Sequence, residues 1–295
     1  MDIRSLSIFI QVAELSSFSK AAEKLGYSQP TISFQIKQLE QELGVPLFDR
    51  IGHTISLTEA GKDALEYAQK ICHLTDEMTL GTHGRKEVKG EVRLAMADSL
   101  CRPLFLEAFA DFHQKFPHVS VHVTTGGTDD MFSQLDHNEV DIVCTLDHHI
   151  FDANYIIANE EQIGVHFIVS SENELASKET VSMETLLQQQ FLLTEKGMSY
   201  RKILDDYLAS KSLEILPILE IGNTNLLCEL VKENVGISFL PDFITEEAVQ
   251  KGHIVRLNVT NFDVTVWKQI LYHRNKWIST PMTAVLEHLK NLTAF

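Results

Sequence analysis

Signatures of several protein classes are missing from this sequence of 295 residues. Its four cysteines lie far apart and form no C-x-x-C pair, which argues against a disulfide scaffold and a zinc knuckle. No run of 18 apolar residues occurs, and Asp2 and Glu14 flank the first apolar stretch, so we expect neither a membrane span nor a signal peptide. We find no G-x-S-x-G, P-loop, H-E-x-x-H or complete dinucleotide-binding motif. We therefore expect a cytoplasmic protein that is not an enzyme, with no catalytic residues, metal or cofactor.

Basic residues are also scarce, and the formal net charge is −16. A protein this acidic would not usually be expected to bind nucleic acid. The charge is unevenly distributed, however, because residues 1–90 carry 10 basic and 12 acidic side chains and residues 91–295 carry 15 and 29. A nearly neutral N-terminal module can still bind DNA through one local face, while the acidic remainder discourages unspecific binding.

The N-terminal module begins with three predicted helices. Apolar residues at helical spacing indicate a helix over residues 3–14, and Ser19 can cap a short second helix that ends at Gly26. A third helix is expected between Ser28 and Gly44, with a proline in its first turn. The apolar residues that this helix should bury are Ile32, Ile36, Leu39 and Leu43.

Two short helices joined by a tight turn are typical of a helix-turn-helix, whose second helix enters the major groove of DNA. The residues on the free face of this predicted recognition helix are Thr31, Ser33, Phe34, Lys37, Gln38 and Gln41. An ordinary solvated surface helix would show a similar pattern. Residues 47–58 then alternate between apolar and polar around a turn at Gly52, which predicts a small hairpin, or wing.

Residues 1–61 contain four characteristic segments, SKAAEKL, SQPTISFQIKQLE, LGVPLFDR and LTEAG. Through these segments this part of the chain resembles the LysR-type transcriptional regulators. The resemblance implies that double-stranded DNA is bound by Gln29, Pro30, Thr31, Ser33, Phe34, Lys37, Arg50 and His53. Phe34 and His53 depart from the family, which often has Arg at the first position and Arg or Lys at the second. Phe34 either packs against the first helix or contacts a thymine methyl group or a sugar.

A long helix is predicted from Thr58 to about Gly81. Positions 57, 61, 64, 68, 71, 75 and 78 follow one another in steps of four and three, as in a heptad seam. We expect a homodimer through the small or apolar residues Ala64, Ala68, Ile71 and Met78, as the resemblance also implies. The alternative is that this stripe packs on its own domain. A two-fold dimer predicts a partly palindromic DNA site, and residues 81–90 are expected to form a hinge.

The C-terminal part is predicted to be α/β. Strand-like runs at 91–97, 119–124 and 140–146 alternate with helical stretches, which indicates a mostly parallel sheet, and a second α/β unit follows. The resemblance implies a two-lobed fold of the periplasmic-binding-protein type II. The expected fold class is therefore an all-α winged helix-turn-helix (1–58), a linker helix and hinge (59–90), and an α/β effector domain (91–295). Its first lobe would comprise 91–161 and 267–295, and its second 162–266.

Ligands of such sheets bind beyond the carboxyl ends of the strands, where helices begin. The resemblance places a small effector in this cleft, and we expect an anionic or polar metabolite. The residues expected to bind it are Ser99, Leu100, Gly127, Thr128, Thr194, Gly197, Ser199 and Asn223. Each hydroxyl alone is more often only a helix cap. Lys196 and Arg201 either neutralise a carboxylate of the effector or are solvated surface charges.

The favoured function is that of a ligand-responsive bacterial transcription regulator. Its expected partners are DNA, the effector, and further copies of itself in the dimer and in the tetramer that the family usually forms, with RNA polymerase as a further candidate. A solute-binding protein or an enzyme on the same fold are the alternatives. Redox sensing by Cys101 and metal binding by His148 and His149 have only weak support.

Overall fold

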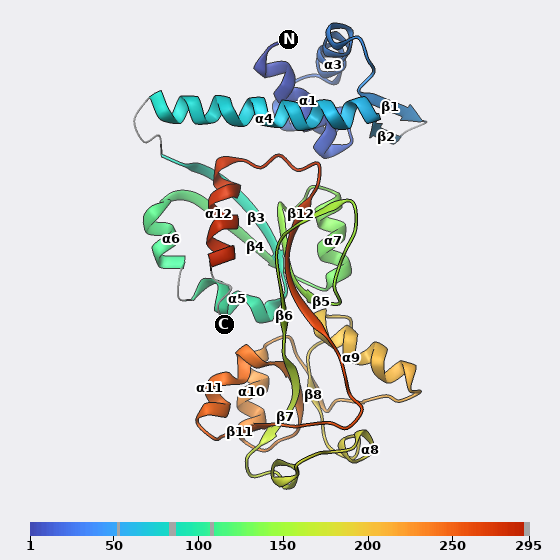
Figure 1. Cartoon of the computed structure of the whole chain (residues 1–295), viewed down its shortest axis with the longest axis vertical. Coiled ribbons are helices and arrows are strands. Elements are labelled where there is room, and N and C mark those ends of the chain that lie inside the picture. The colour runs from blue at the N-terminus through green and yellow to red at the C-terminus, as the bar shows by residue number, and fades with distance from the viewer. Residues whose placement is uncertain (52–53, 83–86, 107–108, 292–295) are drawn as a thin grey trace.

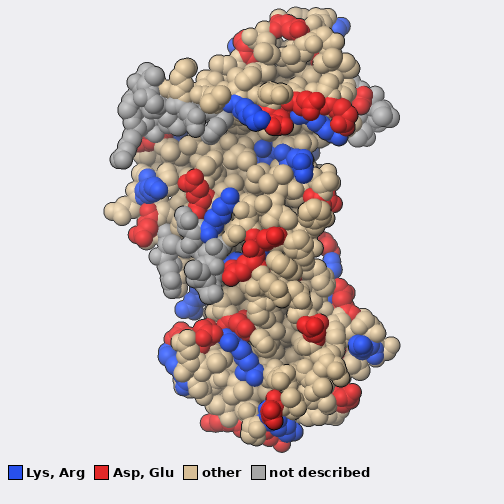
Figure 2. All heavy atoms as spheres, viewed as in Figure 1, with Lys and Arg blue, Asp and Glu red and all other residues tan. Residues whose placement is uncertain are grey.

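The computed structural model describes residues 1–51, 54–82, 87–106 and 109–291. Figure 1 shows an elongated arrangement with an N-terminal domain at one end and two α/β lobes below it. In Figure 2 the molecule narrows where the two lobes meet, and on this face acidic and basic side chains are interspersed over the surface. None of the described helices is both long and apolar enough to cross a membrane.

The N-terminal domain is a three-helix unit with a hairpin and a long helix. Its elements are α1 (Ile3–Leu15), α2 (Phe18–Leu25), α3 (Gln29–Leu43), β1 (Phe48–Ile51), β2 (Thr54–Leu57) and α4 (Glu59–Thr82). The cap of α2 is Ser17 rather than Ser19, because the Phe18 ring packs against Phe48 and the helix starts at that residue. Gly26 ends α2 with a φ of 69°, as expected, and the Ser28 hydroxyl accepts from the amide of Thr31 at the start of α3.

The core of this domain lies between α1, α3 and the hairpin. Ile32, Ile36 and Leu39 of α3 are fully buried, whereas Leu43 in its last turn is exposed, contrary to expectation. The Phe9 and Phe48 rings meet edge-on, with 5.5 Å between their centroids. Edge-on aromatic contacts of this kind stabilise a packed core beyond the area that they bury.

Helix α4 packs along α1. Ala68 is only 1% exposed within the N-terminal core, and Ala64 also packs against it. The prediction that Ala68 faces a second copy is therefore wrong, because α1 of the same chain occupies that side of the helix. Ala64 is only partly buried, and its contact with a second copy stays a prediction. Ile71 and Met78 are exposed, and they lie about 60–80° around α4 from Ala68.

Lobe 1 contains a five-stranded sheet in the order β4-β3-β5-β12-β6. Its strands are β3 (Lys89–Met96), β4 (His118–Thr125), β5 (Ile142–Asp147), β6 (Tyr155–Ile163) and β12 (Val266–His273). Strands β3, β4 and β5 are parallel, and β12 is antiparallel to both of its neighbours. The helices of this lobe are α5 (Asp98–Phe105), α6 (Phe109–Lys115), α7 (Thr128–Asp136) and α12 (Thr280–Asn291).

Lobe 2 follows directly after Gly164 and ends where the chain returns into β12. Its strands are β7 (Val165–Ser170), β8 (Leu192–Leu193), β9 (Leu219–Glu220), β10 (Ser238–Pro241) and β11 (Ile254–Arg256). Strand β7 is antiparallel to both β10 and β11, while β8 and β9 are parallel. The helices are the 3-10 turn Glu174–Ser177, α8 (Met183–Leu186), α9 (Ser199–Ser210), α10 (Thr224–Lys232) and α11 (Asp242–Gln250).

Candidate functional site

The outer face of α3 is polar and open, apart from one aromatic ring. Lys37 is exposed and forms no ion pair with any residue that the structure describes, and the Gln29 amide donates to the Ser33 hydroxyl at 2.9 Å. Thr31 and Pro30 lie in the exposed first turn. Phe34 is 65% exposed, so it does not pack against the first helix. An exposed ring on this face is available to a ligand outside the domain.

The hairpin is attached to α3 by a residue that the sequence did not single out. The Glu40 carboxylate accepts from the backbone amides of Leu47 at 2.9 Å and Phe48 at 3.4 Å, just where the chain enters β1. Glu40 therefore sets the position of the wing relative to α3. The side chain of Arg50 and the whole of His53 lie outside the described residues.

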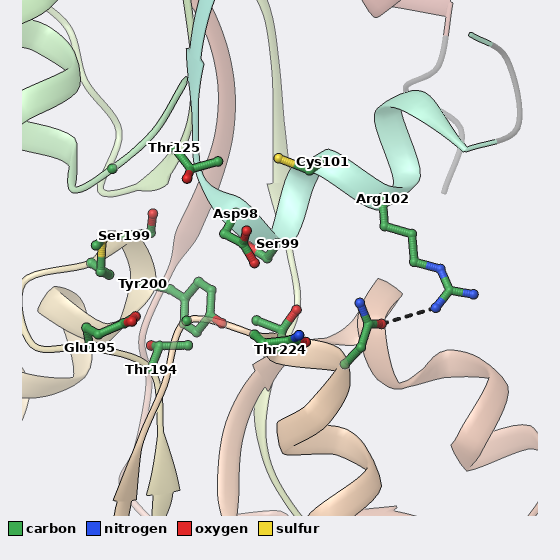
Figure 3. A pocket seen from close by; sticks show the side chains of 15 residues that line it. Asp98, Ser99, Cys101, Arg102, Thr125, Thr194, Glu195, Ser199, Tyr200 and Thr224 are labelled. Carbon is green, nitrogen blue, oxygen red and sulfur yellow. Dashed lines mark hydrogen bonds between the residues drawn. The ribbon is translucent and has the colours of Figure 1, made fainter. Parts of the chain in front are cut away.

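A cavity of about 470 Å³ opens where the two lobes face each other. Lobe 1 contributes to its lining Asp98, Ser99, Cys101, Arg102, Thr125 and Gly126. Lobe 2 contributes Thr194, Glu195, Met198, Ser199, Tyr200 and the turn 222–225. Figure 3 shows the N-terminal part of α5 facing the residues that lead into α9 and α10. Free backbone N–H groups at the starts of these helices carry partial positive charges next to the cavity.

The structure brings together four of the eight residues that the sequence predicts for the effector, namely Ser99, Thr194, Ser199 and Asn223. The other four do not line the cavity. Leu100 points into the hydrophobic core, and the Thr128 hydroxyl lies 3.4 Å from that of Thr145. Gly127 and Gly197 approach each other so closely that a Cβ added at Gly127 would lie 3.2 Å from the Gly197 carbonyl oxygen.

Ser199 holds an unusual backbone conformation at the cavity wall. Its φ is 37°, a left-handed value that costs free energy for a residue other than glycine. The cap of α9 is Met198, without a side-chain hydrogen bond, so Ser199 does not act as a helix cap. Its hydroxyl has no hydrogen-bond partner among the residues described and is open to the cavity.

Arg201 has a structural role and fits neither of the two alternatives predicted for it, a contact to the effector or a solvated surface charge. Its side chain is 3% exposed and donates to the Thr194 carbonyl oxygen at 2.7 Å and to Asp205 at 2.8 Å. The guanidinium thereby fixes the loop before α9. Lys196 is exposed and does not line the cavity, so neither residue contributes a cation to it.

Comparison with known proteins identifies the family. Residues 85–294 match the family described as LysR substrate binding domain, and residues 3–62 match the bacterial regulatory helix-turn-helix protein, lysR family. The uncharacterized HTH-type transcriptional regulator YwqM of Bacillus subtilis (strain 168) is 30% identical over 289 residues, which cover 97% of this chain and 98% of that protein. The chain belongs to the LysR family.

Other proteins are similar to this chain over most of its length. The HTH-type transcriptional activator CmpR of Synechocystis sp. is 27% identical, over 97% of this chain and 94% of that protein. The alignment with the structure of full-length BenM covers 100% of this chain and 97% of the BenM chain, with a TM-score of 0.54 and 24% identity. The alignment with that of CrgA from Neisseria meningitidis covers 99% of each chain, with a TM-score of 0.52 and 23% identity. This LysR-family protein is thus a DNA-binding transcriptional regulator and not an enzyme.

The helix-turn-helix domain of this LysR-family protein contacts lobe 1 directly. The Glu14 carboxylate of α1 accepts from the backbone amide of Trp277 at 2.6 Å, and the Gln69 amide of α4 donates to the Asn275 carbonyl oxygen at 3.2 Å. Beside this junction, the Lys276 ammonium lies 2.6 Å from Asp141 and also donates to Asn138. The loop that follows β12 therefore joins the two domains.

The weaker signals of the sequence gain no support. Burial, and then the charge of Asp98, raise the pKa of Cys101 to about 11, so its thiol stays protonated at neutral pH and is a poor redox sensor. The His149 ring is hydrogen-bonded to Glu160 at 2.8 Å. Within the described ranges, no group of His, Cys, Asp and Glu side chains is arranged to hold a metal ion.

Proposed function

We propose that this LysR-family regulator senses a small polar molecule in the cavity between its lobes. The observation that carries the proposal is that both lobes supply polar groups to one cavity, with Ser99 on lobe 1 opposite Thr194 and Ser199 on lobe 2. A ligand that contacts both walls binds more tightly when the lobes are close, and it therefore shifts the population toward a closed arrangement. The volume is in the range of small-molecule sites.

We further propose that DNA is read by the outer face of α3 together with the wing. The exposed Lys37 favours contact with a phosphate or a base edge, and the exposed Phe34 favours contact with a thymine methyl group or a sugar. Gln29, Pro30, Thr31 and Ser33 lie on the same open part of the helix and complete this surface. Contacts from Arg50 and His53 are proposed from the sequence alone.

We also propose that α4 joins two copies, with Ile71, Met78 and the partly buried Ala64 at the contact but without Ala68. Large exposed apolar side chains on one face of this helix support such a contact. Two recognition helices related by a two-fold axis would read a partly palindromic site. Pairing of dimers into a tetramer, and contact of the DNA-bound assembly with RNA polymerase, belong to the same proposal.

The sensing proposal can be tested with two matched serine variants of the full chain. Once a metabolite screen by thermal shift has found a ligand, we expect Ser199→Ala to reduce the ligand-induced shift while it leaves the ligand-free melting temperature nearly unchanged. Ser182→Ala is the control, because the Ser182 hydroxyl caps α8 outside the cavity and accepts from the amide of Thr185 at 3.2 Å. It should lower the ligand-free melting temperature, by the loss of about 1 kcal/mol of capping, without changing ligand affinity. Unchanged ligand affinity in Ser199→Ala would contradict the proposed site.

A further inference from the structure

The effector cavity of this regulator is acidic, which has consequences for the ligand it takes. Among the described residues that line it, Asp98 and Glu195 are anionic and Arg102 is the only cation. Arg102 donates to the side-chain oxygen of Asn225 at 3.2 Å, and Figure 3 places it on the opposite side of the cavity from Glu195. The carboxylates are therefore not neutralised by this arginine.

Neither carboxylate has a partner within the described part of the chain. The side-chain carboxylates of Asp98 and Glu195 form no hydrogen bond and no ion pair with other described residues. Burial raises the pKa of Asp98, and the negative charge of Glu195 raises it further. Asp98 also stabilises the first turn of α5, as an acidic residue does at a helix N-terminus, but Glu195 has no such role.

The backbone next to Glu195 is shaped to leave room for its carboxylate. A Cβ added at Gly222 would lie 2.8 Å from a carboxylate oxygen of Glu195, so any larger residue at this position would displace it. The Glu195 carboxylate thus lies directly beside the backbone of Gly222 at the cavity wall.

A second and independent feature is the buried hydroxyl of Tyr200. This residue is 3% exposed, lines the cavity, and its hydroxyl has no hydrogen-bond partner of acceptable geometry among the described residues. Thr194 is a polar neighbour, but the two hydroxyls do not form a bond of that geometry. In Figure 3 the Tyr200 ring lies between Glu195 and Asp98. A buried polar group without a partner costs free energy, which a ligand that hydrogen-bonds to it would recover.

We propose that the effector is a small molecule with a protonated amine, bound between Asp98 and Glu195, and with an oxygen atom that pairs with the Tyr200 hydroxyl. This rests on the proposed function, since it takes the cavity as the effector site. A cation relieves the repulsion between the two carboxylates, and hydrogen bonds to charged groups are about twice as strong as neutral ones. The N–H groups at the starts of α9 and α10 suit the electronegative end of such a molecule. Both carboxylates would repel a simple anion, and the described residues of the lining offer no free cation to bind it.

The test compares positively charged amines with uncharged derivatives of the same compounds. Amino alcohols, diamines and amino acids are screened at millimolar concentration against the full chain by thermal shift and calorimetry, each beside its N-acetylated counterpart. We expect at least one amine to bind and its acetylated counterpart not to bind. The isosteric variants Asp98→Asn and Glu195→Gln should each weaken that amine about tenfold or more, and Tyr200→Phe should weaken it less. Glu233→Gln, an exposed acidic position of lobe 2 outside the cavity, is the control and should bind like the original protein.

The outcomes separate this proposal from the function on which it rests. The amine proposal is overturned if no amine binds, or if amine affinity is the same in Glu195→Gln as in the control. If an anion binds instead, with an affinity that Ser199→Ala lowers and Glu195→Gln raises, the amine proposal fails and the cavity remains the sensing site. If a ligand that changes DNA affinity is insensitive to substitutions at Ser199, Glu195 and Tyr200 alike, the proposed site itself fails. Ligand-free melting temperatures of all variants show whether each one is folded.

Discussion

A charge placed on the open face of α4 should break the proposed dimer. Large apolar side chains lie along this face in steps of four, three and four, at Tyr67, Ile71, Leu74 and Met78, and all are exposed. At about 100° per residue these positions form one stripe, roughly 120° from the stripe that packs against α1. Leu74 is near the centre of the stripe, and we predict that Leu74→Glu separates the two copies.

The size of this effect follows from the exposure of Leu74. Full burial of a leucine side chain contributes about 1.5–3 kcal/mol, and 61% of Leu74 is open in the single chain, so its burial in a dimer contributes roughly 1–2 kcal/mol per copy. Two copies give about 2–4 kcal/mol, and two glutamates facing each other add repulsion. We therefore expect the dimer dissociation constant to rise at least about thirtyfold, since each 1.4 kcal/mol is about tenfold.

Sedimentation velocity at micromolar concentration measures the assembly state of each variant directly. Lys62→Glu is the matched control, because position 62 lies on the same helix but about 150° from the stripe, and its pair with Glu59 is exposed. The control should keep the assembly of the original protein, whereas Leu74→Glu should sediment as a smaller species with an unchanged melting profile of its helices. Equal sedimentation of Leu74→Glu and the original protein would remove this stripe from the interface.

Three further predictions concern DNA binding and acid stability. Phe34→Ala should weaken binding to the cognate site more than to random DNA, and replacing thymine by uracil at one position should cost affinity in the original protein but not in the variant, as measured by fluorescence anisotropy. Arg50→Ala should weaken binding to all sequences alike and reduce the slope of log affinity against log salt by about one. Burial opposes ionisation of Asp141, but hydrogen bonds from Arg93 and the charge of Lys276 outweigh it and lower its pKa. Its contribution to stability is therefore present above pH about 4 and lost as the pH falls through the folded pKa, so acid unfolding should show a smaller pH dependence in Asp141→Asn.

Local signals in the sequence were sufficient where one residue and its neighbours decide the structure. Gly26 and Ser28 end one helix and start the next as predicted, because a left-handed turn and a cap depend on two or three residues. The start of α2 was misplaced by two residues because Ser17 and Ser19 are equally good caps. The choice between them is made by Phe18, whose ring packs against Phe48 far along the chain.

The heptad pattern of α4 could not tell contacts within a chain from contacts between chains. Both kinds of contact select apolar residues in steps of three and four. The predicted seam lies between the stripe that packs against α1 and the exposed stripe that contains Leu74. The burial of Ala68 depends on α1, whose packing against α4 is not encoded in residues 59–82. Ile71 is only three residues after Ala68, but it lies about 60° around the helix and is exposed.

Of the residues that line the cavity, the sequence could predict only those at the starts of helices. Ser99 and Ser199 lie where a strand gives way to a helix, which sequence patterns detect. Leu100 is next to one of them but points into the core, since adjacent residues of a helix lie about 100° apart. Glu195 and Tyr200 gain their importance because lobe 2 faces Asp98 of lobe 1. That juxtaposition arises from the chain crossing twice between lobes, and no local pattern reports it.

The same two crossings give a physical route from the cavity to the DNA-binding domain. In Figure 1, β12 runs from the border of the lobes up to the loop beneath α4. It is hydrogen-bonded on both sides, to β5 and β6, so it moves as part of a stiff sheet rather than alone. Its loop then meets α1 through Trp277 and Glu14, and α4 through Asn275 and Gln69. The bonded sheet thus connects the border of the lobes to the contacts with α1 and α4, and the shift in lobe arrangement proposed above would reach the DNA-binding domain through these contacts.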